Sequence, residues 1–177
     1  MKIKINGGTV MNNPALVTFQ THHDEFYFLG IENVLTDSAD FGYFWDNFFK
    51  LGGYDKINPY AIDPKPINVW YTKKTGEKIY FQGLMVKDVD TVPEGYTMAK
   101  FPASDFIVVT HDWFPTYSEA QGYGIDAGWK NIKTVQIPDG YIRNDGEDSA
   151  ITVIERDNHD TPEGSRIEFW VPIKKRN

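Results

Sequence analysis

Two glutamates in the last third of the chain are the residues best placed to do chemistry. Glu155 lies in "TVIERD" and Glu168 in "RIEFWVPIKK", two segments whose composition predicts a β-hairpin across "NHDTPEG". Side chains alternate between the two faces of a strand, so Glu168 shares one face with Trp170, while Ile167 and Phe169 share the other. The Glu168 face is therefore either exposed to solvent or one wall of a pocket that holds a carboxylate beside a large ring.

Other common kinds of catalytic or metal site find no support in the sequence. The chain has no cysteine, which excludes disulfides, thiolate zinc sites and a cysteine nucleophile. His22, His23, Asp24 and Glu25 are consecutive, so on a strand they point to alternate faces and do not converge on a metal ion. Glycine-rich phosphate-binding motifs and the G-x-S-x-G motif are absent from the sequence. We expect no metal and no cofactor.

Composition restricts the partners of the protein. Its 177 residues are enough for a single domain with a sizeable core. The net charge of -7 argues against nucleic-acid binding, which needs a clustered basic surface. No segment approaches the roughly 18 apolar residues of a membrane helix, and the start lacks the apolar region of a secretion signal. We expect a cytoplasmic protein that contacts neither nucleic acid nor membrane.

The first half of the chain has the pattern of a strand, a helix and a hairpin. Strands are predicted at 15–19 and 26–35. A helix follows in "DFGYFWDNFFKLGG", where Asp40 or Ser38 caps the start and Gly52 and Gly53 end it. Its aromatic residues recur at helical spacing: Phe41, Phe44, Trp45, Phe48 and Phe49. After a loop at "NPYAIDPKP", residues 67–86 form two strands joined by a turn at "KKTGEK".

The second half repeats the same order. Strands are predicted near 96–101 and 105–111, and two pairs, Thr116 with Glu119 and Ser118 with Gln121, have the spacing of a capping box. The helix that follows carries an apolar stripe through Ile125, Trp129 and Ile132. A loop at "IPDGYIRNDGEDS" leads to the hairpin formed by 150–157 and 166–174. The two rounds are separated by "DVDTVPEG" at 88–95, which is rich in turn-forming residues.

The closing motif resembles a known family. "ITVIERDN" followed by "SRIEFWVPIKK" is similar to the C-terminal signature of GyrI-like, or AraC-type, effector-binding domains, and the resemblance extends back over roughly residues 10–175. It implies an α+β fold in which two strand-helix-strand-strand modules, an SHS2-type duplication, form a curved antiparallel sheet with two helices. We expect one domain over 1–177, with halves at about 10–87 and 96–175 and a pocket between them.

The resemblance also implies the residues of the site. Family members bind bulky, often aromatic or cationic ligands with a strand glutamate and surrounding rings. The motif places that glutamate at Glu168, with Trp170 beside it and Glu155 on the other arm of the hairpin. A carboxylate and ring faces attract a delocalised cation through charge and cation–π contact. The full set expected to bind ligand is Glu168, Trp170, Glu155, Tyr80, Trp113 and Tyr117.

Three functions stay open at this point. The first is a stand-alone small-molecule binder, acting as a sensor or a sequestering protein. The second is a hydrolase of strained cyclopropane-type toxins, in which a pocket glutamate, Glu168, would act as general base with Tyr80 or Tyr117 assisting. The third is a protein inhibitor or adaptor that presents an acidic surface to an unknown partner.

Overall fold

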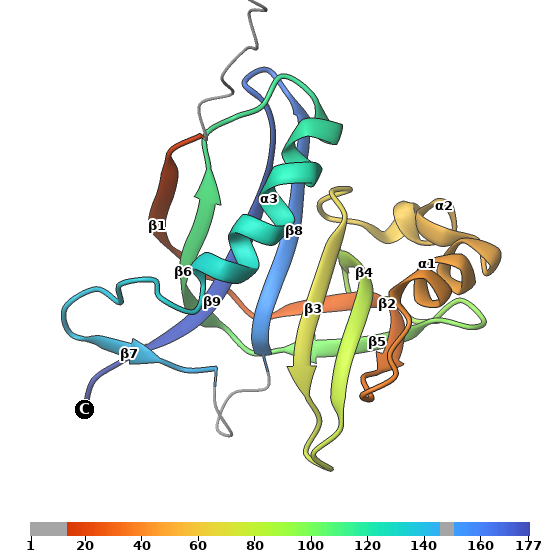
Figure 1. Ribbon diagram of the computed structural model, residues 1–177. Helices are drawn as coiled ribbons and strands as arrows, with labels where there is room; N and C mark the ends of the chain where they lie inside the picture. Colours follow the sequence, from red (N-terminus) through yellow and green to blue (C-terminus); the bar gives the residue numbers. More distant parts are fainter. Residues whose placement is uncertain (1–13, 146–150) are drawn as a thin grey trace, which may run out of the picture.

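One antiparallel sheet organises the described part of the chain. The computed structural model describes residues 14–145 and 151–177 (Figure 1), and within them the sheet has nine strands. The first half contains β1 (Leu16–His23), β2 (Phe26–Val34), α1 (Phe41–Lys50), α2 (Gly53–Ile57), the 3₁₀ turn η1 (Asn58–Tyr60), β3 (Ile67–Thr72) and β4 (Lys78–Val86). The second contains β5 (Thr97–Phe101), β6 (Ser104–His111), α3 (Tyr117–Asn131), β7 (Tyr141–Arg143), β8 (Ile151–Thr161) and β9 (Gly164–Lys175).

The strand order contains the expected duplication. Strands run β1-β6-β9-β8-β3-β4-β2-β5 across the sheet, and β7 adds to β9. The modules β2-α1-β3-β4 and β6-α3-β8-β9 therefore have the same strand order, and they meet where β3 pairs with β8. The α+β class and the curved antiparallel sheet are confirmed. The start of the first half, at residues 10–13, lies outside the described residues.

Two short links join opposite ends of this sheet. Strand β1 pairs with β6 at one end, yet only Asp24 and Glu25 separate it from β2 near the other end. Likewise, only Pro102 and Ala103 connect β5 to β6. The sheet must curl for both links to span it, and an apolar core fills the inside of the curl. Phe26 and Phe101 from one end lie in this core with Phe106 from the other.

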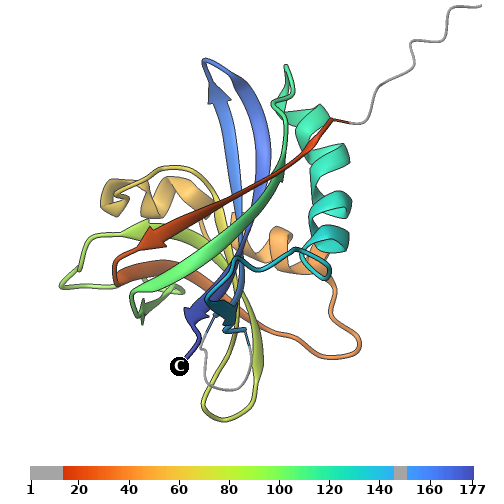
Figure 2. The same ribbon diagram turned by 90° about the vertical axis from the view of Figure 1, so that its left-hand side faces the viewer.

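The helices cover the outer face of the curled sheet. In Figure 1, α3 lies to the left of the line where β3 meets β8, and α1 and α2 lie to the right of that line. Figure 2 shows the curl of the sheet from the side. Beneath α3 lies a cluster that includes Ile167, Phe169 and Val171 of β9. Beneath α1 and α2 lies a cluster that includes Leu29 and Phe48. Each half thus has its own outer core, and both halves share the inner core.

Local sequence explains where the long helices begin and end. The Asp40 side chain accepts a hydrogen bond from the backbone N–H of Tyr43 at 3.1 Å, which caps α1. Gly52 follows α1 with a φ of 116°, a conformation that favours glycine. The predicted capping box at Thr116 and Glu119 is present at the start of α3. Both predicted helices are confirmed, and α3 ends at Asn131, three residues before the end expected from the sequence at 134.

Several elements differ from the sequence-based expectation, among them β8, which was expected to end at 157 and continues to Thr161. Strand β1 continues to His23, because its whole length pairs with β6. Between the end of α1 and the loop expected at 58–66, the structure adds the short helix α2 to the two long helices that were expected. The segment at 137–149, also expected to be a loop, contributes β7, which pairs with the end of β9. Within the described residues, no helix is long and apolar enough to cross a membrane.

Candidate functional site

A pocket lies between the helices of the two halves. It has a volume of about 430 Å³, and its floor is formed by β3 and β8, where the two modules meet. Residues from α1, α2 and α3 form its walls. The lining residues are Trp45, Phe49, Tyr54, Pro66, Asn68, Tyr80, Tyr117, Gln121, Ile125, Glu155, Asp157 and His159.

Glu155 is the buried carboxylate of this pocket. Its side chain points to the helix face of β8 and the residue is only 8% exposed. Asn68, directly opposite on β3, donates a hydrogen bond from Nδ2 to Glu155 Oε1 at 3.2 Å. Burial and the charge of Asp157 raise the pKa of Glu155 to about 7, although hydrogen bonds from Asn68 and Trp129 oppose the rise. Glu155 can therefore gain or lose a proton near neutral pH.

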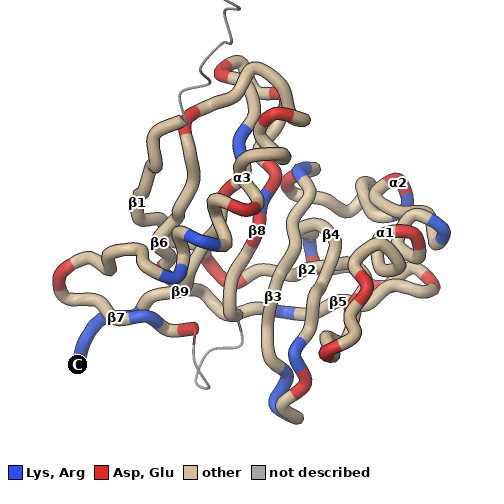
Figure 3. The backbone as a smooth tube through the Cα atoms, viewed as in Figure 1, with Lys and Arg blue, Asp and Glu red and all other residues tan. Residues whose placement is uncertain are grey.

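A second carboxylate lies beside Glu155 on the same face. Asp157 is two residues further along β8, and the Tyr117 hydroxyl donates a hydrogen bond to its Oδ2. Burial raises the pKa of Asp157, while the hydrogen bond from Tyr117 opposes the rise. Figure 3 shows the acidic and basic residues that alternate along β8 beside α3. Because Arg156 points to the other face, only the acidic residues of this stretch, Glu155 and Asp157, line the pocket.

Aromatic side chains form the opposite wall. The rings of Trp45 and Phe49 are stacked with their centroids 5.7 Å apart. Tyr80 lines the same pocket, and burial is the main cause that raises the pKa of its hydroxyl, a rise that the Trp45 side chain opposes. The hydroxyl of Tyr54 is buried and has no hydrogen-bond partner among the residues that the structure describes. The pocket thus combines ring faces with two carboxylates, an arrangement that suits a cation with flat apolar groups.

The comparison with protein families matches residues 21–173 to the family described as integron-associated effector binding proteins, Cass2. The match covers most of the chain and includes every element of the pocket. The chain belongs to this family. The predicted resemblance to GyrI-like effector-binding domains is thereby confirmed. A comparison with the curated proteins found no significant match.

Solved structures support the fold of this effector-binding family member. The integron cassette protein VCH_CASS2 of Vibrio cholerae has a TM-score of 0.50 and 11% identity, with 89% of this chain and 95% of that chain covered. SAV2435, solved with bound tetraphenylphosphonium, has a TM-score of 0.56 and 10% identity over 89% of this chain and 94% of its own. The C-terminal domain of EcmrR has a TM-score of 0.51 and 13% identity, with coverages of 91% and 99%.

The structure brings together three of the predicted site residues of this effector-binding protein. Glu155, Tyr80 and Tyr117 all line the pocket. Glu168 and Trp170 do not, because they occupy the face of β9 that points away from the helices. The expectation that they face the groove between the halves is therefore wrong. The physical reason is the curl of the sheet, which buries both faces of β9 and turns the Ile167 side toward α3.

Glu168 is instead the centre of a buried ionic network on the inner face. It accepts hydrogen bonds from Arg166 at 2.9 Å, from Trp170 Nε1 at 3.0 Å and from Asn158 at 3.2 Å, and Arg156 lies at 3.5 Å. Burial alone would raise the pKa of Glu168. The charge of Arg166 and the hydrogen bond from Trp170 together with Arg156 lower it. Glu168 thus stays ionised and fully paired.

Trp113, the remaining predicted site residue, belongs to the same side of the molecule as this network. Its ring lies 4.2 Å from the Arg166 guanidinium, a cation–π contact that covers the ion pair with Glu168. It is not among the residues that line the pocket. A ligand contact of Trp113, Glu168 or Trp170 therefore stays an untested prediction.

Several pocket residues were not identified from the sequence. Asp157 could have been identified from the sequence, because a residue two positions from Glu155 on a strand lies on the same face. Trp45 and Phe49 carry the periodic signal of a helix face, which does not distinguish a core contact from a pocket wall. Asn68 and Tyr54 gave no signal, since their positions depend on strand pairing and on the short helix α2.

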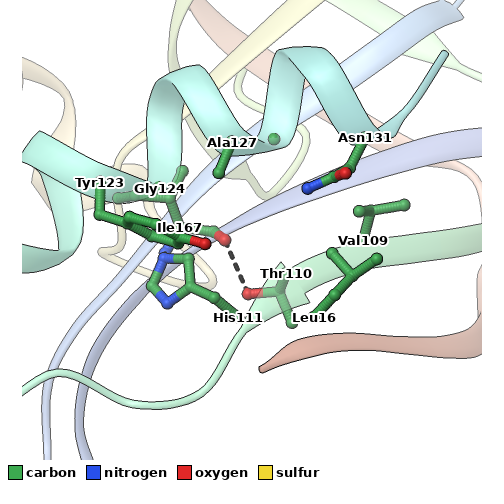
Figure 4. Close-up of a pocket in the computed structure, with 10 residues that line it drawn as sticks. Leu16, Val109, Thr110, His111, Tyr123, Gly124, Ala127, Asn131 and Ile167 are labelled. Atoms are coloured by element: carbon green, nitrogen blue, oxygen red, sulfur yellow. Dashed lines mark hydrogen bonds between the residues drawn. The ribbon is translucent and has the colours of Figure 1, made fainter. Parts of the chain in front are cut away.

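A second hollow lies under α3, on the side toward β1 (Figure 4). Thr110 donates a hydrogen bond from Oγ1 to the carbonyl oxygen of Ile167 at its base, at 2.7 Å. Its enclosed volume of about 10 Å³ is the size of a single water molecule. The pocket between the halves is large enough for a drug-sized molecule, and this hollow is not.

Proposed function

We propose that this protein binds small aromatic cations in the pocket between its halves, as a sensor or a sequestering protein. The observation that carries the proposal is the burial of Glu155 at the floor of a pocket walled by aromatic rings. A buried carboxylate without a countercharge is unfavourable in the empty protein. A cationic ligand supplies that countercharge.

The charge distribution supports a cation over an anion or a neutral ligand. Two carboxylates, Glu155 and Asp157, line the pocket, and no lysine or arginine is among the described lining residues. The basic residues nearest in sequence, Arg156 and Arg166, are engaged with Glu168 on the other face. A cation with aromatic groups would also contact the faces of Trp45 and Tyr80, each cation–π contact being worth about 0.5 to 2 kcal/mol.

Tetraphenylphosphonium is a suitable probe, because it is the ligand bound in the SAV2435 structure and its charge is permanent. Binding should quench the fluorescence of Trp45 in a saturable manner. Glu155→Gln removes the charge with little change of shape, so we expect its dissociation constant to rise by about tenfold or more. Glu163→Gln is the matched control, since Glu163 is exposed in the β8–β9 turn. Equal affinities for wild type and Glu155→Gln would refute the proposal.

A hydrolytic function is the second candidate, and the pKa of Glu155 is the observation that favours it. A carboxylate with a pKa of about 7 can accept a proton from water near neutral pH while the water oxygen attacks a strained electrophile. Tyr117, held by Asp157, lies in the same pocket. A hydrolase would lose turnover in Glu155→Gln and retain much of its substrate binding. A pure binder would show no turnover above the buffer rate in either form.

A further inference from the structure

A row of buried amide side chains crosses the sheet beneath α1 and ends at Glu155. Asn33 of β2, Gln82 of β4 and Asn68 of β3 are 8%, 0% and 4% exposed. Asn68 is directly opposite Gln82 on one side and directly opposite Glu155 on the other. Three uncharged amides in succession at buried positions are costly to keep, because each must satisfy a donor and an acceptor.

The direction of the row is set at its far end. The Asn33 Nδ2 group donates to the backbone carbonyl oxygens of Tyr80 at 3.2 Å and Ile31 at 3.3 Å, which fixes this amide with its N–H groups toward Gln82. The same group donates to Gln82 Oε1 at 3.0 Å. Gln82 must therefore turn its own N–H groups away from Asn33, toward Asn68.

The near end of the row has the same direction. Asn68 donates from Nδ2 to Glu155 Oε1 at 3.2 Å, which leaves its oxygen facing back along the row. Gln82 Nε2 and Asn68 Oδ1 are both buried, and neither has a hydrogen-bond partner within residues 14–145 and 151–177. They are a donor and an acceptor on directly opposed residues, so a hydrogen bond between them would complete the row.

We propose that Asn33, Gln82 and Asn68 are positioning residues that hold the Glu155 carboxylate as an acceptor facing the pocket. In this way they favour the ionised form of Glu155, which is the form that binds a cation. The inference rests on the proposed function. It adds that two residues outside the pocket lining, Asn33 and Gln82, act on the ligand only through Asn68 and Glu155.

Other groups around Glu155 act on it in either direction. Asp157 on β8 opposes its ionisation, and the Trp129 indole on α3 favours it. Tyr54 of α2, Tyr80 of β4 and Tyr117 of α3 are neutral hydroxyls whose pKa values are raised mainly by burial. Asn68, at the near end of the amide row, is the group on the sheet of the first half that donates a hydrogen bond to Glu155. Removal of this hydrogen bond should therefore make Glu155 harder to ionise while leaving the neighbours in place.

The test measures the ionisation of Glu155 in two independent ways. Carboxyl ¹³C NMR titration gives the pH at which half of Glu155 is ionised in the free protein. The pH profile of tetraphenylphosphonium binding gives a second midpoint for the same ionisation, because the charge of the probe does not change with pH. Asn68→Leu should raise both midpoints by about one pH unit, the value of one hydrogen bond to a charged group. Gln82→Leu should raise them by about half a unit, acting through Asn68.

Asn158→Leu is the matched control. Asn158 is a buried amide that donates to Glu168 at 3.2 Å on the other face of β8, the same distance as the bond from Asn68 to Glu155. It should lower stability without moving either midpoint. If Gln82→Leu does not fold, Asn33→Leu tests the row from its far end, with the same direction of shift expected.

The outcomes separate the two proposals. Unchanged NMR midpoints in folded Asn68→Leu and Gln82→Leu would overturn the inference, whether or not the probe binds. A probe that fails to bind wild type at any pH would overturn the proposed function, while the NMR titration would still decide the role of the row. Equal shifts in Asn158→Leu would show that the effect is general destabilisation, which also overturns the inference.

Discussion

The carboxylate of Glu155 is buried where a charge is costly, and its neutral form is favoured by the fold. Its pKa is raised from 4.5 to about 7, so the stability that the neutral acid provides is complete below the unfolded-state value and is lost as the pH rises through 7. Glutamine resembles the neutral acid at every pH. Residues selected for stability alone would therefore not include a glutamate here.

Glu155→Gln should accordingly stabilise the protein in alkaline solution. We expect a gain of about 3 kcal/mol in the free energy of unfolding at about pH 8 and almost none at about pH 4. Urea denaturation at the two pH values measures the difference. A gain of the same size at both pH values would mean that packing, and not ionisation, is responsible.

Glu168 has the opposite energetics, because its charge is paired. Glu168→Gln leaves the largely buried Arg166 guanidinium without its carboxylate partner and leaves Arg156 paired with Asp63 alone, so we expect a loss of about 3 kcal/mol of unfolding free energy at neutral pH. Probe affinity of the folded variant should not change, since this network lies on the face away from the pocket. A fall in affinity comparable to that of Glu155→Gln would restore Glu168 as a ligand-binding residue.

At the scale of elements, α3 is distinguished by its close approach to the sheet. A Cβ added at Gly128 would lie 2.0 Å from the ring of Phe169, whereas one added at Gly122 would meet nothing within 4 Å. Glycine at position 128 is therefore required for contact between α3 and β9, whereas no packing contact requires glycine at position 122. The two positions form a matched pair.

Gly128→Ala and Gly122→Ala should have opposite effects on stability. Alanine at 122 improves helix propensity, for an expected gain of about 0.5 to 1 kcal/mol. Alanine at 128 has the same propensity gain but forces α3 off Phe169, for an expected net loss of about 1 to 3 kcal/mol. Thermal melts of the two variants measure both. A stabilising Gly128→Ala would show that α3 adjusts freely over the sheet.

The elements predicted from sequence are those with a local signal. The aromatic stripe of α1, the capping box at Thr116 and the turn at Gly76 each depend on residues close in the chain, and all three are present. Helix α2 has five residues and starts at a glycine, and β7 has three residues that pair with the distant β9. Neither contains enough residues for a periodic pattern, so their existence depends on tertiary contacts.

The site was predictable only in part for a related reason. Strand alternation correctly separated Glu168 from Phe169, and Glu155 was identified as a candidate. Which face of β9 borders the helices could not be determined from alternation, because the curled sheet buries both faces of that strand. Asn68 opposes Glu155 only through the β3–β8 pairing, which no local pattern specifies.

At the scale of the whole molecule, we propose that the chain folds as one domain. The two modules share the inner core, where Val69 of one packs in the same cluster as Ile154 of the other. Neither half could keep this core without the other. Urea unfolding followed by far-UV and near-UV circular dichroism should therefore give one coincident transition. Two separated transitions would show that the halves are independent domains.

The links at 24–25 and 102–103 also restrict motion about the line where the halves meet. Each link ties one end of the sheet to the other within two residues, so the modules cannot swing apart as the jaws of a hinge without stretching both connections. The mouth of the pocket is then set by covalent geometry, and its shape varies mainly through rotation of rings such as Trp45 and Phe49. Molecules of different outline would be accommodated by side-chain rearrangement around a fixed frame.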